Sequence, residues 1–362
     1  SPTGSGVVNG TLTTGSWSGS GGTVTSSSAT YSEVGTFLLK LEDQSFANID
    51  SADTAGSDRY FSGTVSVGRF TPHHFQTTTN KACNSFTYSG QPFRVEIAAL
   101  NLAGNPTLNY ALTSNTITLT EATISGTGNW TNNLVPSSAL GALTAVGSGL
   151  PSFAFTSRAT APTTISVRAT DIDSVSSSGF EGAANTPIVS GRMRMLNVHG
   201  SERLALKLPV AIEYFDTTGT SGWRQASNGN IYVDTCTTIA ASNLAFTAAP
   251  ACNTAVTSCI TAPSLSSTLS NGAYVAPWTV TLARPTSSGN VCVGLNLDGT
   301  ATGKQCLATG ASGSTASTVN TQGVSGAAWL KYPWNNATDR NPSAIVTFGV
   351  YKSPLIYGRE NY

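Results

Sequence analysis

The chain has 362 residues, of which 18 are Lys or Arg and 18 are Asp or Glu, so its formal net charge is zero. An average cytosolic domain has roughly 25% charged residues, whereas here Ser, Thr, Gly, Ala and Asn separate short apolar runs, as in exported β-rich proteins. The balanced charge argues against a nucleic-acid partner, and no apolar run is long enough for a membrane helix. We therefore expect an exported protein with no nucleic-acid partner and no membrane span.

The first expected unit covers residues 1–66 and is an immunoglobulin-like β-sandwich or part of one. Tyr31 precedes a Gly-led apolar strand from Gly35 to Leu41, as in many bacterial immunoglobulin-like modules. The opening residues lack the cationic start and apolar run of a signal peptide, so we expect a mature, processed chain. A nearby acidic group is expected to be solvated surface charge: Glu42, Asp43, Asp50, Asp53 and Asp58.

Two further units are expected, a β-sandwich over residues 67–190 and a Cys-containing β-rich domain over residues 191–362. Apolar residues alternate with polar ones in both, which is typical of strands with one buried face. The longest case is Leu204–Tyr214, where Pro209 on the outward side indicates an edge strand or a bulge. The same alternation is found around Phe93–Ile97, Ile117–Leu119, Ile165–Ala169 and Trp278–Leu282. The sequence thus predicts an all-β fold of two or three immunoglobulin-like β-sandwich domains in series.

Few residues suit a metal site. His73 and His74 are adjacent, and neighbouring strand residues point to opposite faces, so we expect them to be structural. His199 precedes Gly200 and is expected in a polar loop. Asp171 and Asp173 resemble the start of a calcium loop, but the later ligands of such a loop are missing. An Asx-type turn that caps the strand Ile165–Ala169 is the favoured interpretation, and we expect no metal and no cofactor.

The chain has six cysteines, an even number that favours disulfides in an oxidising compartment. Zinc is the weaker alternative because even the closest pair is separated by six residues. Fifteen pairings are open; proximity in sequence favours Cys252 with Cys259 and Cys292 with Cys306, which leaves Cys83 for Cys236.

No catalytic constellation is evident in the sequence. There is no Gly-x-Ser-x-Gly elbow and no pair of carboxylates in a recognisable context, so we expect no enzyme activity. Five tryptophans lie near Gly- or Asn-rich segments, where their rings either pin loops to a sandwich, which we favour, or stack on sugars. They are Trp17, Trp130, Trp223, Trp329 and Trp334.

Several motifs taken in order resemble the C-terminal region of MshQ-like proteins, a domain of unknown function encoded with type IV pilus biogenesis genes in Gram-negative bacteria. The motifs include Val67–Phe75, Phe86–Phe93, Arg168–Ser176, Gly191–Glu202, Asp234–Thr237, Trp329–Tyr332 and Phe348–Tyr351. The resemblance covers about residues 60–362 and implies an all-β fold, export and a pilus-associated or surface setting, with no catalytic residues to carry over. The lectin-like sandwich that often precedes this region in MshQ-like proteins is not found in the sequence.

The expected function is that of a secreted cell-surface structural protein, either pilus-associated or forming an extracellular filament. The alternative is an adhesin or glycan-binding module, and the expected location is the outside or outer surface of a Gram-negative bacterium. Two terminal segments, residues 6–12 and 344–357, are β-prone and weakly charged, and either is expected to complete a sheet of a neighbouring subunit by strand addition; the alternative is that both close their own domains. The expected partners are other copies of the chain or pilus components, and surface glycans under the alternative.

Overall fold

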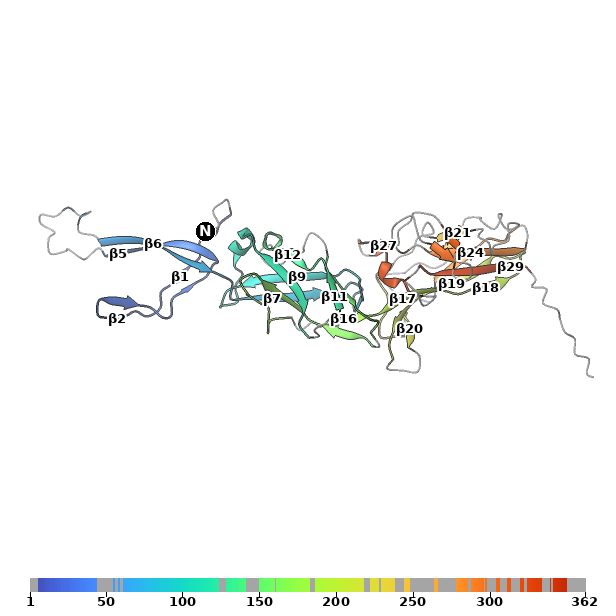
Figure 1. Cartoon of the computed structure of the whole chain (residues 1–362), viewed down its shortest axis with the longest axis horizontal. Helices are drawn as coiled ribbons and strands as arrows, with labels where there is room; N and C mark the ends of the chain where they lie inside the picture. The colour runs from blue at the N-terminus through green and yellow to red at the C-terminus, as the bar shows by residue number, and fades with distance from the viewer. Residues whose placement is uncertain are drawn as a thin grey trace, which may run out of the picture.

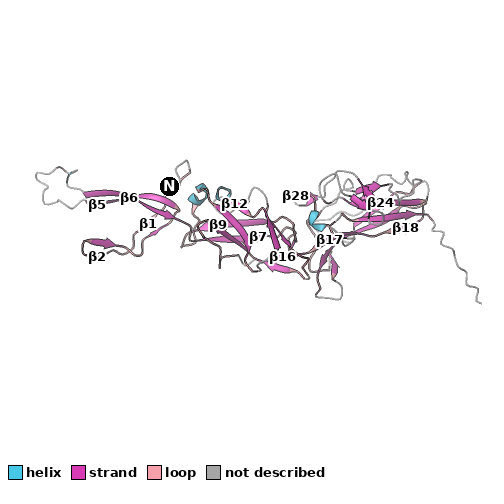
Figure 2. Ribbon diagram, in the orientation of Figure 1, coloured by secondary structure: helices cyan, strands magenta, loops and turns pink. Residues whose placement is uncertain are grey.

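The computed structural model contains strands, turns and short 3-10 helices (Figure 2). This is the all-β architecture that the alternating apolar pattern predicts. The structure describes residues 6–43, 55, 58, 61–123, 128–140, 150–159, 161–182, 186–217, 222–227, 229–237, 244–247, 264–265, 278–285, 288–295, 297, 304–306, 311–313, 320–321, 324–333, 339 and 341–349.

The N-terminal region forms two-stranded pairs. Short strands β1 (Leu12–Thr13) and β4 (Thr30–Tyr31) pair with each other, as do β2 (Ser18–Ser20) and β3 (Thr23–Thr25). The longer strands β5 (Gly35–Asp43) and β6 (Phe61–Phe70) form an antiparallel ribbon that projects from the sandwich beside it at one end of the molecule (Figure 1). The boundary expected between residues 66 and 67 lies inside β6.

Glu33 attaches this region to the body of the protein. Its carboxylate is buried and accepts hydrogen bonds from the backbone N–H groups of Leu108, at 2.9 Å, and Asn109, at 3.1 Å. These N–H groups begin the 3-10 helix η3 (Leu108–Leu112). The Asn109 side chain in turn bonds both backbone groups of Val8, at 2.7 and 2.8 Å. Two separate parts of the N-terminal region are thus fixed to one short helix.

The first sandwich contains the strands of residues 74–189. Its described strands form two three-stranded sheets, with the orders β12-β10-β15 and β14-β16-β8, and two pairs, β7-β9 and β11-β13. The strands are β7 (His74–Asn80), β8 (Thr87–Tyr88), β9 (Arg94–Leu100), β10 (Thr116–Glu121), β11 (Gly128–Thr131), β12 (Leu134–Pro136), β13 (Ser152–Phe155), β14 (Thr163–Ile165), β15 (Val167–Asp171) and β16 (Thr186–Val189).

The core of the first sandwich comes from alternate positions of these strands. Val95 and Ile97 of β9 and Ile117 and Leu119 of β10 are almost completely buried together with Phe153. Burying one such side chain contributes about 1.5–3 kcal/mol. The alternation in the sequence therefore identified the buried face of these strands.

The second sandwich packs two sheets with the orders β17-β19-β23-β22 and β18-β29-β24-β21, and β20 also pairs with β19. Residues from both sheets, such as Val210 and Val293, share one core. Further short pairs are β25-β26 and β27-β28. The strands are β17 (Gly191–Met195), β18 (Val198–Gly200), β19 (Leu206–Phe215), β20 (Trp223–Gln225), β21 (Leu244–Thr247), β22 (Ser264–Leu265), β23 (Trp278–Leu282), β24 (Gly289–Leu295), β25 (Lys304–Cys306), β26 (Ala311–Gly313), β27 (Asn320–Thr321), β28 (Val324–Ser325) and β29 (Ser343–Phe348).

Strand β19 is an inner strand with continuous register at Pro209, so the expectation of an edge strand or a bulge there is wrong. Val210 pairs with Met195, the last residue of β17, and Pro209 accepts only a long bond from Leu196 N–H, 3.4 Å, just past the end of β17. In an antiparallel ladder the N–H and C=O of one residue point to the same neighbour. The N–H that Pro209 lacks would point toward β17, just past the end of the β17 ladder. Pairing with β23 on the other side continues, with Pro209 opposite Thr279.

The described part of the C-terminal β-prone segment lies within its own sandwich. Strand β29 pairs with β18 on one side and with β24 on the other, and Ala344, Val346 and Phe348 are buried. Residues 350–357 of that segment lie outside the described residues. The part of the chain that the structure describes contains no helix of the length and hydropathy needed to cross a bilayer.

Candidate functional site at the junction of the two sandwiches

One segment of the first sandwich completes the core of the second. Cys83, Phe86 and Tyr88 are 0% exposed and pack with the apolar residues of the second sandwich. The strand within this segment, β8, pairs in parallel with β16, which leads directly into β17 of the second sandwich. The two sandwiches, which follow each other along the long axis of the molecule (Figure 1), therefore share a continuous buried region.

The sequence at this crossing leaves room for the Tyr88 ring. Gly191 is the first residue of β17, and a Cβ atom there would lie 2.4 Å from Cδ1 of Tyr88 and 2.8 Å from Cδ2 of Leu330. Real Cβ atoms do not come this close to a carbon, so only glycine fits without displacing a buried ring.

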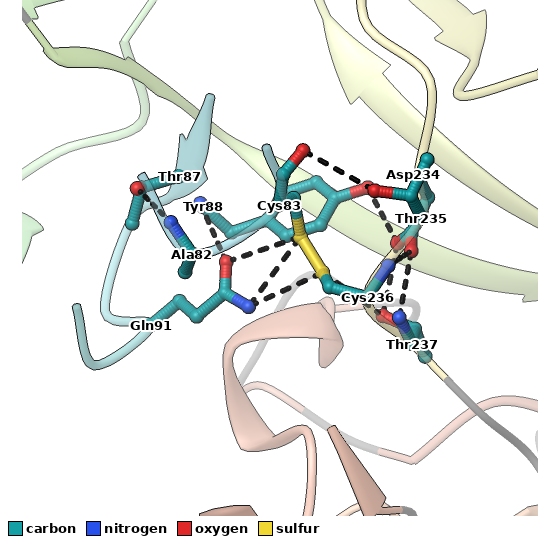
Figure 3. Close-up of a disulfide and its surroundings, with 9 residues drawn as sticks. All are labelled: Ala82, Cys83, Thr87, Tyr88, Gln91, Asp234, Thr235, Cys236 and Thr237. Atoms are coloured by element: carbon teal, nitrogen blue, oxygen red, sulfur yellow. Dashed lines mark hydrogen bonds between the residues drawn. A yellow bond between two sulfur atoms is a disulfide. The ribbon is translucent and has the colours of Figure 1, made fainter. Parts of the chain in front are cut away.

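A disulfide joins the two sandwiches at this place. Cys83 of the first sandwich is bonded to Cys236 of the second, 153 residues later (Figure 3). Gln91 lies beside both sulfurs: its Nε2 is 3.5 Å from Sγ of Cys83 and 3.4 Å from Sγ of Cys236, while its Oε1 accepts the Tyr88 N–H at 3.0 Å. The pairing of Cys83 with Cys236 that the sequence suggested is confirmed.

Asp234 organises the part of the second sandwich that carries Cys236. Its Oδ1 accepts the backbone N–H groups of Cys236, at 3.0 Å, and Thr237, at 2.8 Å. Its Oδ2 accepts the hydroxyls of Thr237 and Tyr88, both at 2.9 Å (Figure 3). Burial raises the pKa of the Asp234 carboxyl, and these donors act in the opposite direction. A buried carboxylate with four donors is a structural group that fixes the Cys236 loop.

The zinc alternative for these cysteines is tested by the same geometry. Cys83, Cys236 and Asp234 are close enough together to surround one ion. Zinc binds thiolates, whereas the two sulfurs are bonded to each other here. In the oxidised protein this cluster is therefore a cross-link and not a metal centre.

Charged and aromatic side chains from both sandwiches also stack on one another at the junction. The Arg192 guanidinium lies 3.9 Å from the ring centroid of Trp223 and pairs with the buried carboxylate of Glu213 at 2.6 Å. The Arg158 guanidinium of the first sandwich lies 4.3 Å from the ring of Tyr332 and 5.5 Å from the ring of Trp223. Such cation–π contacts contribute about 0.5–2 kcal/mol each, depending on burial.

A cavity of about 440 Å³ opens next to this cluster. The first sandwich contributes Ser89, Gly90 and residues 154–158, and the second contributes Gly191 and the segment that contains Trp329 and Tyr332. The volume lies within the range of about 300–1,000 Å³ that is usual for small-molecule sites.

The pairing of the other four cysteines stays a prediction. Cys252 and Cys259 lie outside the described residues. Cys292 is in β24 and Cys306 is in β25, and these strands lie close together, but the two side chains also lie outside the described part of the chain.

The Asp171 carboxylate forms the expected Asx-type turn. Its Oδ1 accepts the backbone N–H groups of Asp173 and Val175, both at 3.0 Å, at the end of β15. Its Oδ2 accepts the Tyr110 hydroxyl at 2.7 Å, and burial with this bond raises the pKa of the Tyr110 phenol. Asp173 pairs with Arg69 at 2.7 Å. The favoured interpretation of this motif is confirmed.

The histidines have protein partners. His74 is buried and stacks on Phe180, with ring centroids 3.7 Å apart, and its Nδ1 lies 3.0 Å from Nδ1 of His73. Burial, with a smaller contribution from His73, lowers the pKa of His74. His199 lies in strand β18 and not in the loop that we expected, and its Nε2 is 2.8 Å from the carbonyl oxygen of Gly349.

The tryptophans have different roles. Trp130 and Trp329 pack against the two cores, as the structural interpretation requires, and Trp130 Nε1 donates to Glu121 at 2.6 Å. Trp17 is 52% exposed and Trp223 joins the cation–π cluster. Trp334 lies outside the described residues.

Sequence reasoning missed the cluster of Arg158, Arg192, Trp223 and Tyr332. Two of its members lie in motifs singled out for other reasons, Gly191–Glu202 and Trp329–Tyr332. Nothing in their spacing indicates that these motifs meet, because the contact depends on how the sandwiches dock.

The fold and the junction define a class of protein: tandem β-sandwiches with a buried cross-link between successive domains. Comparison with protein families specifies it further. The model for the third domain of DUF6701 matches residues 33–189, and the model for the fourth domain matches residues 189–361. The chain therefore carries the third and fourth domains of the DUF6701 family. A search of curated proteins found no significant match.

Proposed function

We propose that this chain is a structural module of a secreted, MshQ-like cell-surface protein of a Gram-negative bacterium, in which the two DUF6701 domains form a stiff joint. The observation that carries the proposal is the Cys83–Cys236 disulfide across the junction. Disulfides persist in oxidising compartments such as the periplasm and the cell exterior, and are rare in the cytosol. The resemblance to MshQ-like proteins adds the pilus-associated setting.

Stiffness follows from the way the junction is built. Domains joined by a simple linker usually move relative to each other unless the interface is large and apolar. Here Phe86 and Tyr88 are buried in the neighbouring domain, and a covalent bond lies beside them. A stiff, elongated pair suits a protein that holds something away from a surface or transmits load along a filament.

The same proposal includes contacts between subunits through the N-terminal segment. Strand β29 is paired on both edges, so its exchange would remove an inner strand from the second sandwich. Residues 6–11 precede β1, and Val7 and Val8 are more than one-third exposed. Strand addition by residues 6–12 to another copy or to a pilus component is the favoured mode, and it requires that the Val8 backbone leave Asn109 and that Leu12 leave β4.

Two measurements test this function. In the native host, an epitope on the chain should be digested by protease added to intact cells, and peptide mapping without reductant should recover Cys83 joined to Cys236. A protein that is protected in the cytosol with both thiols free would overturn the proposal.

Assembly is tested on the purified protein by negative-stain microscopy. The full chain should form head-to-tail polymers or bind purified pili, and deletion of residues 1–12 should leave a folded monomer that does neither. If the truncated protein assembles as the full chain does, strand addition by the N-terminal segment is wrong.

A second candidate function, an adhesin or glycan-binding module, is favoured by one observation, the cavity beside Arg158.

A further inference from the structure

The cavity at the junction contains a cation with no acidic partner. Arg158 lines it, and the only contacts of this side chain among the described residues are the aromatic rings and a 3.4 Å bond from Nη1 to the Tyr332 hydroxyl. Arg192, by contrast, is paired with Glu213. A guanidinium has five N–H donors in a planar fork that matches a carboxylate, and most of those of Arg158 remain available.

The rest of the lining is suited to an oxygen-rich ligand. The lining includes a second cation, Lys331, and four hydroxyl-bearing residues: Ser89, Thr156, Ser157 and Ser190. One carboxylate, the exposed Asp339, also belongs to the lining, so the cations outnumber the acids by two to one among these residues.

Trp329 adds a donor that lacks an acceptor. Its indole Nε1 is buried and makes no hydrogen bond, although the residue lines the cavity. A buried donor without a partner is unfavourable, and an oxygen atom that reached it would remove this cost. Because this nitrogen is buried, a ligand reaches it only if the covering atoms move, so the preference for a ligand with several oxygens comes from the two cations and the serine and threonine residues of the lining.

The aromatic rings hold Arg158 in place. Stacking against Tyr332 and Trp223 restricts the guanidinium, so less rotamer entropy is lost when it binds a ligand. Since Arg158 belongs to the first sandwich and both rings belong to the second, the binding geometry exists only while the domains are docked.

We propose that this cavity binds an acidic sugar, with its carboxylate on Arg158 and its hydroxyls on the serine and threonine side chains. This inference deepens the second candidate function and is independent of the stiff-joint proposal, because a rigid junction needs no ligand.

The test uses the full chain and four probes: D-glucuronate, N-acetylneuraminate, neutral D-glucose and acetate. Binding is measured by calorimetry and by shifts of the tryptophan indole N–H signals in NMR. We expect an acidic sugar to bind and to shift the Trp329 signal, and glucose and acetate to bind at least tenfold more weakly.

The variant Arg158→Gln should weaken binding of the acidic sugar at least tenfold and lower the melting temperature only slightly, because the exposed side chain loses cation–π contacts at the low end of their range. Arg203→Gln is the matched control: its side chain is 88% exposed and lies after β18, away from the cavity, so binding should not change. Equal binding by the wild type and Arg158→Gln, or no binding of either acidic sugar at 10 mM, would overturn the proposal while leaving the stiff joint untouched.

Discussion

The Tyr88 hydroxyl donates a hydrogen bond of 2.9 Å to the Asp234 carboxylate, across the boundary between two domains and 146 residues apart in sequence. Both groups are fully buried. Hydrogen bonds to charged acceptors contribute about 1.5–3 kcal/mol, roughly twice the value for neutral pairs. The free energy of unfolding that is lost when this bond is removed therefore measures how strongly the two domains are coupled.

Replacing Tyr88 with Phe should lower the free energy of unfolding by about 1.5–3 kcal/mol, because Asp234 loses one donor while the ring still fills its place. Chemical denaturation followed by tryptophan fluorescence measures this. Tyr31→Phe is the control: among the described residues the Tyr31 hydroxyl bonds the Gly10 N–H alone, in a half-buried position, and its cost should be about 0.5 kcal/mol or less. Equal stability of Tyr88→Phe and the wild type would contradict the coupling.

The double variant Cys83→Ala/Cys236→Ala should unfold at lower denaturant concentration, with a loss of about 2–5 kcal/mol, because the disulfide closes a loop of 153 residues in the unfolded chain. The comparison is made without reductant so that the other cysteines keep their state. A double variant as stable as the wild type would show that the cross-link adds nothing to a junction already held by packing.

Stability should depend on pH through His74. Burial lowers the pKa of His74 in the folded protein below the ordinary value of 6.5, which applies to the unfolded chain. At a pH between the lowered pKa and 6.5, the unfolded chain therefore binds more protons than the folded one. The free energy of unfolding is therefore largest above pH 6.5 and should fall as the pH decreases below it. His74→Phe, which keeps a ring against Phe180, should flatten the melting temperature between pH 5 and 7, whereas the control His199→Asn should not. A slope unchanged in His74→Phe would contradict this assignment.

Chelation by EDTA should leave the melting temperature unchanged, because the oxygens of Asp171 already accept protein donors from Asp173, Val175 and Tyr110. Differential scanning calorimetry with and without EDTA gives the answer. A drop of about 5 °C, corresponding to about 1 kcal/mol or more for a domain of this size, would restore the calcium interpretation.

Much of the fold could be predicted from the sequence because strands with one buried face repeat every two residues. Ile117 and Leu119, for example, are both fully buried in β10 as their spacing indicates. The expectation drawn from Pro209 is wrong, because a missing N–H marks where a ladder ends and does not say whether the rest of the strand has two neighbours.

The candidate site could be predicted only in part. The number and spacing of cysteines left Cys83 for Cys236, and that pair is formed. The bond from Tyr88 to Asp234 and the stacking of Arg158 on Tyr332 depend on the docking of two domains. No local pattern encodes such a contact, because it is set by shape and burial at positions more than 140 residues apart.

The shared core also sets an order of events during synthesis. Cys83, Phe86 and Tyr88 leave the ribosome about 150 residues before Cys236 does, and domains generally fold from the N-terminus onward. Until the later domain arrives, the earlier one carries an unpaired thiol beside two uncovered aromatic rings. A chain that stops before Cys236 would keep this apolar patch permanently, and would be a natural substrate for chaperones and a starting point for aggregation.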